Sequence, residues 1–294
     1  MKTALVLLVL ALQLVLELSA LTLINKPSAI LYTSPEKESF IEDILRYGAH
    51  VTLLQEQEGF AQVSHQQRGL AEACPPASTG WLHKTDLLEV SKDPHLLATA
   101  FVGYRGAYLF KEADTKRGPF LTLPFETPLE VAEELPETCR RWIIVRLQDG
   151  QKAYVQRSQM VFEKRVLNMA EMVAFSQQFI GLKYLFGGTT SFGYDCSGFT
   201  QMLYRQMGVI IPRNSYQQAV DPRFQEVQEA QAGDLVFFYN AQGSVVHVGM
   251  MINSTEFIHS FPKRESWICI TRLDEKTLHD SSLYSYCEVR RLST

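Results

Sequence analysis

The sequence predicts an α+β protein in which two small all-β domains precede a domain that contains both helices and strands. Residues 21–92 carry short apolar strands separated by turns, and residues 93–164 repeat that pattern. From residue 165 onward, apolar residues recur at helical spacing, and three strands follow. A helical stretch followed by a run of strands favours an α+β fold for residues 165–294.

The first 20 residues have the pattern of a secretory signal peptide. Lys2 supplies a positive start, an apolar run follows over residues 4–16, and Ala20 is a small residue suited to cleavage. The alternative is a membrane anchor, but a spanning helix needs about 20 apolar residues, and Glu17 interrupts the run. We therefore predict an exported protein, with no stable membrane span in its mature form.

Composition excludes several classes of function. The chain of 294 residues is 46% hydrophobic and 20% charged, with a net charge of -4, which is ordinary for a folded soluble protein. No basic stripe predicts a nucleic-acid partner. The sequence has neither a Gly-rich phosphate loop nor a CxxC pair, so we expect neither Mg-nucleotide chemistry nor a Cys-rich zinc site.

The cysteine count points to a free thiol. The chain contains five cysteines, an odd number, at positions Cys74, Cys139, Cys196, Cys269 and Cys287. In an exported protein, an odd count indicates at least one unpaired, reactive cysteine. The spacing leaves open whether the other four form two disulfides or none.

The two β segments share their order of strands and turns. In the first we predict strands over residues 29–32, 50–55, 60–63 and 81–82, and a loop over 69–80. In the second we predict a strand over 107–110 and a hairpin of 142–147 and 152–156, closed by Asp149-Gly150. The exit of the second, 153–160, parallels 80–87. Both segments resemble bacterial SH3-like barrels, and one irregular β domain is the alternative.

In the third segment, we predict a helix over 166–179 that ends before Gly181, and a second helix over 197–207 that ends before Gly208. Strands are predicted over 235–239, 245–252 and 256–260.

Cys196 lies at the predicted start of the second helix, just after a loop. A helix N-terminus favours negative charge, so we expect this position to lower the thiol pKa and to favour the reactive thiolate. A catalytic thiol also needs a base, which is usually a histidine. The alternative is a structural cysteine.

Two histidines lie in consecutive predicted strands. His247 and His259 are each six residues from Asn253, the expected centre of the connecting turn. They would then oppose each other directly, on one face of the hairpin and about 5 Å apart. His247 would accept the thiol proton while His259 orients its ring. A slip of one residue would place the two rings on opposite faces.

Six motifs in order resemble the NlpC-type cell-wall cysteine peptidases, a papain-like family. They are Tyr184-Leu185-Phe186-Gly187-Gly188, Tyr194-Asp195-Cys196-Ser197-Gly198, Ile211-Pro212-Arg213 with Ser215 and Gln218, Gly233-Asp234-Leu235-Val236-Phe237-Phe238, His247-Val248-Gly249, and Ile258-His259-Ser260. Phe186 replaces a Trp of the family pattern.

The resemblance implies Cys196 as nucleophile, His247 as base and His259 as third polar residue. It also implies substrate-binding positions at Tyr184, Asp195 and Ser197. The alternative for Tyr184 is a packed aromatic side chain, and for Asp195 and Ser197 it is helix capping. Arg213, Ser215 and Gln218 are expected to hold the loop beneath the site.

Family members with SH3-like domains often cut peptidoglycan stem peptides between D-γ-glutamate and the diamino acid. This resemblance implies a peptidoglycan or muropeptide substrate, a thioester intermediate and no cofactor. Ser78 stands where some members carry a Tyr that helps to hold a free L-Ala amine, so a requirement for that amine stays open. The alternatives are an amidase or acyltransferase, and a non-catalytic module that binds the cell wall.

Overall fold

The computed structural model describes residues 21–36, 39–65, 78–91, 93, 97–261, 267–274 and 284–293. The predicted signal peptide, Cys74 and most of the predicted 69–80 loop lie outside these residues. The chain divides into two compact units. The first unit comprises Met1–Ala29, Arg46–His65 and Thr79–Phe162, and the second comprises Ile30–Leu45, Gln66–Ser78 and Glu163–Thr294.

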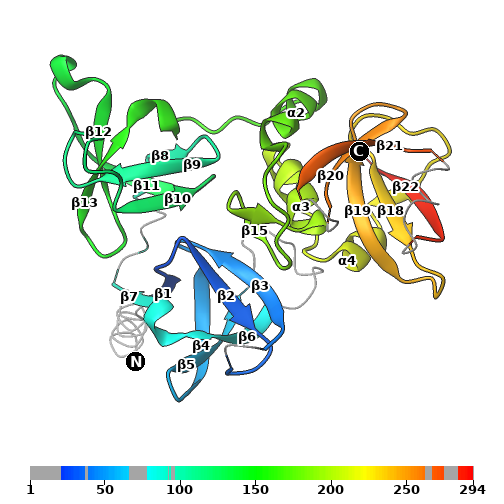
Figure 1. Cartoon of the computed structure of the whole chain (residues 1–294), viewed down its shortest axis with the longest axis horizontal. Coiled ribbons are helices and arrows are strands. Elements are labelled where there is room, and N and C mark those ends of the chain that lie inside the picture. The colour runs from blue at the N-terminus through cyan, green and yellow to red at the C-terminus, as the bar shows by residue number, and fades with distance from the viewer. Residues whose placement is uncertain are drawn as a thin grey trace, which may run out of the picture. The chain divides into compact units, whose positions relative to one another are not determined.

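Two sheets of seven strands each form the N-terminal half of the chain (Figure 1). The first has the order β3-β2-β6-β5-β4-β1-β7 and the second β10-β9-β13-β12-β11-β8-β14. The first sheet consists of β1 (Leu21–Ile24), β2 (Ser28–Tyr32), β3 (Ile41–Arg46), β4 (His50–Gln57), β5 (Phe60–His65), β6 (Ser78–His83) and β7 (Leu87–Val90). The second consists of β8 (Ala100–Val102), β9 (Gly106–Phe110), β10 (Leu121–Pro124), β11 (Pro128–Glu134), β12 (Trp142–Arg146), β13 (Lys152–Gln156) and β14 (Met160–Val161).

The two sheets have the same strand order. β8 occupies the position of β1, β9 that of β2, and so on in sequence to β14, which occupies the position of β7. A short 3-10 turn precedes the last strand of each, η1 (Lys84–Asp86) and η4 (Arg157–Gln159). The predicted internal repeat is therefore confirmed. The loop prediction was wrong at its end, since residues 78–80 begin β6. The likeness to SH3-like barrels stays a prediction.

The predicted hairpin of the second sheet forms at Asp149-Gly150. Gly150 has a φ of 82°, a left-handed conformation that glycine adopts without strain, and its N–H donates to the carbonyl of Leu147 at 3.0 Å. β12 and β13 then pair in register from Trp142 with Gln156 to Arg146 with Lys152. The inward side chains of these strands are fully buried in the core of this sheet.

Among the described residues, the second unit contains the helices α2 (Met169–Ser176), α3 (Cys196–Gln206) and α4 (Ser215–Ala219). α2 begins three residues later than predicted, because Asn168 and Glu171 form a capping box that fixes its first turn. It ends at Ser176 and passes into the 3-10 turn η5 (Gln177–Phe179) before Gly181. α3 agrees with its prediction to within one residue at each end, whereas α4 was not predicted.

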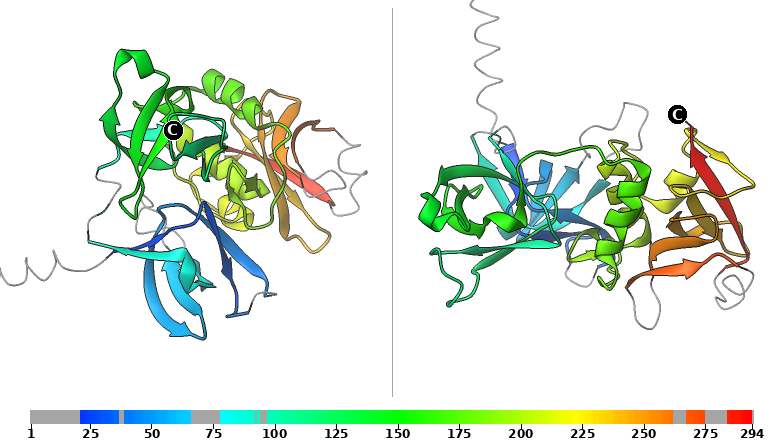
Figure 2. Two further views of the ribbon diagram at one scale, coloured as in Figure 1. Left: turned by 60° about the vertical axis from the view of Figure 1, so that its left-hand side comes forward. Right: turned by 90° about the horizontal axis from the view of Figure 1, so that it is seen from above.

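The main sheet of the second unit has six strands in the order β17-β22-β18-β19-β20-β21. These are β17 (Phe224–Glu226), β18 (Leu235–Tyr239), β19 (Val245–Met251), β20 (Glu256–Ser260), β21 (Ile268–Arg272) and β22 (Tyr286–Leu292). β18, β19 and β20 are the three predicted strands, and the others were not predicted. Helices α3 and α4 pack against β19 on one face of this sheet (Figures 1 and 2).

The register between β19 and β20 differs from the predicted one. Met250 pairs with Ile258 and Met251 with Phe257, so the turn is centred on Ser254. Asn253 accepts from two backbone N–H groups of this turn through its side chain and does not occupy its centre. The prediction that His247 and His259 oppose each other directly was therefore wrong. They are diagonal neighbours, and they share a face because the register shift is two residues.

Continuing that register places Gly249 opposite His259. A Cβ atom on Gly249 would lie 2.5 Å from Cδ2 of Phe257 and 3.1 Å from Cβ of His259. The absence of a side chain at Gly249 therefore makes room for the ring of His259 to lie diagonally toward His247.

Among the described residues, no helix is both long enough and apolar enough to cross a membrane.

We expect Gly249→Ala to destabilise the second unit by about 1–3 kcal/mol, because the added methyl overpacks the β19–β20 pair. The substitution should also displace the ring of His259. Any activity that depends on this histidine should then fall by more than the loss of folded protein accounts for. Thermal unfolding followed by circular dichroism measures the stability change. Val246→Ala, on an exposed position of the same strand, is the control. A Gly249→Ala protein as stable as the control would contradict this account of the glycine.

Candidate active site

The N-terminus of α3 presents Cys196 at its first helical position. Asp195 caps the helix, since its Oδ1 accepts from the backbone N–H of Gly198 at 2.6 Å. A short hairpin of β15 (Thr189–Thr190) and β16 (Gly193–Tyr194) leads into this cap. The hydroxyl of Ser260, which follows His259 on β20, donates to the carbonyl of Tyr194 at 2.7 Å. This bond ties the histidine strand to the chain just before the cysteine.

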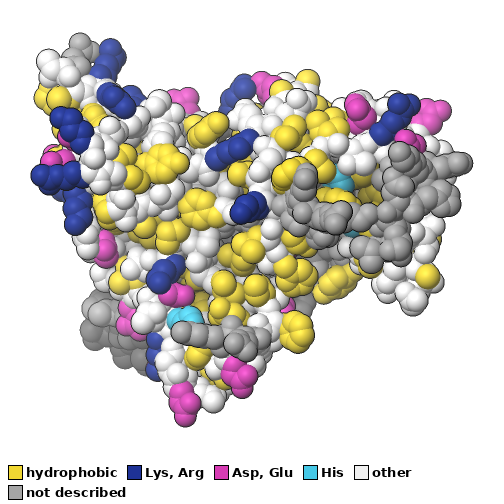
Figure 3. Space-filling view, in the orientation of Figure 1, with side chains coloured by type: hydrophobic (Ala, Val, Ile, Leu, Met, Phe, Trp, Pro, Cys, Tyr) yellow, Lys and Arg dark blue, Asp and Glu magenta, His cyan; other side chains and the backbone are white. Residues whose placement is uncertain are grey.

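His247 and His259 form a buried pair. Nε2 of His247 lies 2.7 Å from Nδ1 of His259, and the side chains are 1% and 3% exposed. The backbone N–H groups of Val248, next to His247, and of Ser197 lie close enough to the thiol of Cys196 to lower its pKa. The structure therefore brings Cys196, His247 and His259 into one site. In the space-filling view, hydrophobic side chains adjoin the histidine surface that is visible on this unit (Figure 3).

Burial opposes charge on each member of this site taken alone. Burial, with the neighbouring Asp195 carboxylate, raises the pKa of the Cys196 thiol to about 12, although two backbone N–H groups and Arg213 act in the opposite direction. Burial lowers the pKa of His247 to about 3. The expectation that the helix N-terminus would leave Cys196 with a lowered pKa was therefore wrong. Desolvation of the thiolate outweighs the helix dipole and the donated hydrogen bonds.

Burial also lowers the pKa of His259 well below its ordinary value, and the neighbouring His247 adds to this effect. At neutral pH the resting site thus contains a thiol and two neutral imidazoles. A proton can leave the sulfur favourably only when His247 accepts it, because the imidazolium then compensates the buried thiolate.

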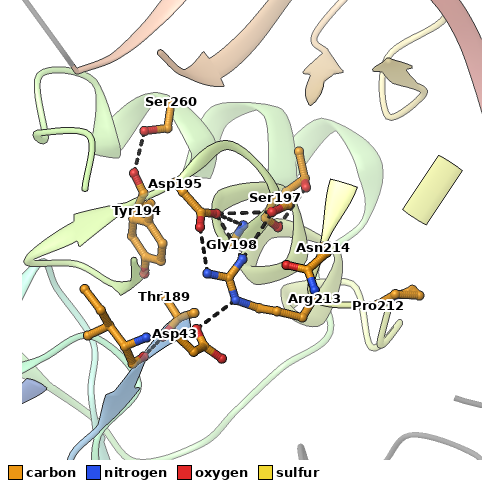
Figure 4. Close-up of polar contacts among 12 residues, drawn as sticks. Asp43, Thr189, Tyr194, Asp195, Ser197, Gly198, Pro212, Arg213, Asn214 and Ser260 are labelled. Carbon is orange, nitrogen blue, oxygen red and sulfur yellow. Dashed lines mark hydrogen bonds and ion pairs between the residues drawn. The ribbon is translucent and has the colours of Figure 1, made fainter. Parts of the chain in front are cut away.

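An ion-pair cluster fixes the start of α3 (Figure 4). Arg213 donates to both carboxylate oxygens of Asp195, at 3.0 and 2.6 Å, and to the hydroxyl of Ser197 at 3.1 Å. Its Nε donates to Asp43 of β3 at 3.0 Å. Both carboxylates raise the pKa of Arg213 against the opposing effect of burial. Each carboxylate oxygen of Asp195 therefore already has a partner within the protein.

Gln218 of α4 also supports the N-terminal part of α3 through hydrogen bonds. Its Nε2 donates to the carbonyls of Ser197 and Pro212, and its Oε1 accepts from Thr200 of α3. Gln218 is fully buried, so these bonds are shielded from water. The contacts of Arg213 and Gln218 agree with the supporting role expected of the loop. Asp43 lies far away in the sequence, and no motif marked it.

Two tyrosines lie near the thiol. Burial raises the pKa of Tyr184, and the charge of Cys196 adds to the shift. The same causes raise the pKa of Tyr284, whose ring stacks on His247 with 5.8 Å between ring centroids and an interplanar angle of 13°. Both phenols therefore stay protonated and can donate hydrogen bonds. Tyr284 was missed in the sequence because it follows the last recognisable motif by more than 20 residues and has no motif around it.

The described part of the chain contains no cluster of three or more His, Cys, Asp or Glu side chains arranged to hold a metal ion. Cys139, Cys196, Cys269 and Cys287 are all free thiols.

We expect Arg213→Met to destabilise the second unit by about 3–5 kcal/mol, because it leaves two largely buried carboxylates without their counter-charge. Asp43→Asn should cost less, since the amide oxygen still accepts from the backbone N–H of Ile44 and from Arg213. Urea denaturation of the two variants and the wild type measures the difference. Equal losses in both variants would show that Arg213 does not act chiefly on Asp195.

A sequence profile of the NlpC/P60 family matches residues 181–284. The chain is 36% identical over 137 residues to a gamma-D-glutamyl-L-lysine dipeptidyl-peptidase of Bacillus cereus, covering 44% of this chain and 41% of that protein. It is 29% identical over 232 residues to the protein of the same name from Bacillus subtilis, covering 74% and 70%. The first of these matches thus spans less than half of the relative's length.

The fold comparison covers more of the chain. The crystal structure of an NlpC/P60 family protein from Bacillus cereus superposes with a TM-score of 0.77, at 24% identity, covering 94% of this chain and all of that one. That identity supports likeness of fold alone. Together with the profile match and the two relatives, it shows that the chain carries an NlpC/P60 domain, which the profile places at residues 181–284.

Proposed function

We propose that the protein is a cysteine endopeptidase that cleaves peptidoglycan stem peptides between D-γ-glutamate and the diamino acid. The observation that carries the proposal is the half-buried thiol of Cys196 at a helix N-terminus, in one site with the buried, hydrogen-bonded pair of His247 and His259. The names of the two Bacillus relatives specify a γ-D-glutamyl-L-lysine bond, which supports this choice of scissile bond.

In the proposed reaction, the thiol proton moves to His247 as sulfur attacks the γ-glutamyl carbonyl carbon. The tetrahedral intermediate collapses when His247 returns the proton to the departing amine of the diamino acid, which leaves a thioester on Cys196. Water, deprotonated by His247, then attacks the thioester, and the proton passes back to the sulfur as the free acid leaves. His259 holds the ring of His247 throughout.

Two groups are placed to stabilise the oxyanion. The backbone N–H of Cys196 is in the first turn of α3, where amides lack intrahelical acceptors. Tyr184 keeps its phenolic proton and lies close enough to Cys196 to sense its charge. We therefore assign Tyr184 to substrate binding. For Asp195 and Ser197 we propose an indirect part, in which they shape the pocket from their bonds to Arg213.

The same proposal extends to the rest of the chain. We propose domain boundaries at 20, 92 and 164, with a signal peptide, two SH3-like domains and the NlpC-type domain in that order. Residues 30–45 nevertheless share a compact unit with the catalytic residues. Export to the periplasm or cell envelope would bring the enzyme to its wall substrate.

The cleavage test uses mature protein, peptidoglycan and purified muropeptides, with products followed by mass spectrometry. We expect new fragments that end in D-glutamate, and a loss of at least about 10³-fold in rate for Cys196→Ala, since a triad without its nucleophile retains little catalysis. Comparing stem peptides that have a free L-Ala amine with those still joined to muramic acid tests the requirement for that amine.

Release of the sugar from the stem peptide would instead support an amidase, and transfer of the acyl group to an added amine would support an acyltransferase. Binding to the wall by both proteins without any cleavage would support a non-catalytic module.

A second prediction concerns the reactivity of the thiol. Since burial raises the pKa of Cys196 to about 12, the thiolate should form at neutral pH only with imidazolium beside it. We expect His247→Ala to slow alkylation of Cys196 by iodoacetamide at pH 7 by at least about 100-fold. The residual rate should then rise about tenfold per pH unit up to pH 10.

Peptide mapping separates Cys196 from the other thiols, and the exposed Cys139 is an internal control whose rate should not change. An unaltered rate at Cys196 in the His247→Ala protein would remove His247 from the role of base.

A further inference from the structure

A third polar side chain extends the histidine pair into a chain of hydrogen bonds. Oγ1 of Thr271, on β21, lies 2.8 Å from Nε2 of His259. The β20–β21 register pairs His259 with Cys269 and Phe257 with Thr271. Thr271 is thus a diagonal neighbour of His259, on the same face of the sheet. The contacts run from His247 through His259 to Thr271.

The direction of donation along this chain decides which nitrogen of His247 carries a proton. A neutral imidazole has one N–H and one acceptor nitrogen, and both nitrogens of His259 have partners. If Thr271 accepts from Nε2–H, Nδ1 of His259 accepts from Nε2–H of His247. The Nδ1 atom of His247 then has a free lone pair. If Thr271 donates instead, every proton moves over by one position, and Nδ1 of His247 is protonated.

The thiol favours the first arrangement. The backbone N–H groups of Val248 and Ser197 act on the sulfur as donors and lower the pKa of the thiol. A protonated Nδ1 on His247 would add a further donor and leave the thiol proton without an acceptor. The imidazolium state requires the same direction, because both nitrogens of a protonated His247 are donors. His259 must then accept at Nδ1 and, being neutral, must donate from Nε2.

We propose that Thr271 is a positioning residue: by accepting from Nε2–H of His259, it holds both histidines in the tautomers that leave Nδ1 of His247 able to receive the Cys196 proton. This inference rests on the proposed function of Cys196 and His247. With Thr271 included, the hydrogen-bond chain has four residues: Cys196, His247, His259 and Thr271. Thr271, the residue farthest from the substrate, then sets the direction in which each hydrogen bond is donated.

Few other atoms can replace the threonine oxygen. In the described part of the chain, the other polar atom within reach of Nε2 of His259 is Sγ of Cys269, at 3.5 Å. A thiol sulfur is a weak acceptor. A valine at position 271 would therefore keep the shape of the side chain while leaving a buried N–H with a poor partner.

The kinetic test compares Thr271→Val with Thr271→Ser and with Ile270→Val. We expect Thr271→Val to lower kcat about 10- to 100-fold with KM unchanged. Thr271→Ser restores the oxygen and should stay within about threefold of wild type. Ile270→Val trims one methyl from the same strand without touching the hydrogen-bond chain, so it controls for weakened packing. A kcat for Thr271→Val equal to that of Ile270→Val would overturn the proposal.

A second measurement does not depend on turnover. The ¹³Cδ2 and ¹⁵N chemical shifts of isotopically labelled histidine report which ring nitrogen is protonated. We expect His259 of the wild type to carry its proton on Nε2, and Thr271→Val to shift it toward Nδ1. The alkylation rate of Cys196 at pH 7 should fall in parallel.

Wild-type His259 protonated on Nδ1 would overturn the proposal. If wild-type protein cleaves no stem peptide, the proposed substrate fails, whereas the tautomers and the alkylation rates still decide the role of Thr271.

Discussion

The carboxylate of Asp195 is the point on which the geometry of the site depends. It caps α3 through Gly198, and it binds Arg213 through both of its oxygens. The cap fixes where the helix begins, and therefore where the thiol of Cys196 is presented. Arg213 also contacts Asp43, so a side chain of β3 contributes to the support of the nucleophile although it precedes it by more than 150 residues.

This arrangement carries an electrostatic cost. Asp195 lies next to the thiol, and its negative charge adds to burial in raising the pKa of Cys196. Arg213 partly offsets that charge, which is one reason for a buried guanidinium between two carboxylates. The site thus favours neutral groups at rest, and charge develops only as a thiolate–imidazolium pair. Such a pair can form when His247 has its acceptor nitrogen toward the sulfur, so the tautomers of the histidines matter as much as their positions.

The sheet sets both the positions and the tautomers of the two histidines. β19, β20 and β21 each contribute one polar side chain to a single face, His247, His259 and Thr271, and their diagonal offsets give contacts of 2.7 and 2.8 Å. Gly249 leaves the space opposite His259, and Ser260 binds the carbonyl of Tyr194 before the helix. Packing of α3 on β19 completes the site.

The sequence by itself determined the residue types Cys196, His247 and His259 and the elements that carry them. Period-2 and helical patterns predicted the repeat of the β segments, α3 and strands β18 to β20, because local burial and turn chemistry dictate them. Ordered motifs predicted Cys196, His247 and His259. Only the tertiary structure decided the diagonal register of the histidines, since turn geometry, with Ser254 at its centre, sets it. Only the tertiary structure revealed the contacts of Asp43, Thr271 and Tyr284, because each meets the site across a distance in sequence that no local pattern encodes. The pKa of Cys196 likewise depended on burial, which is a property of the assembled fold and overrode the local effect of the helix N-terminus.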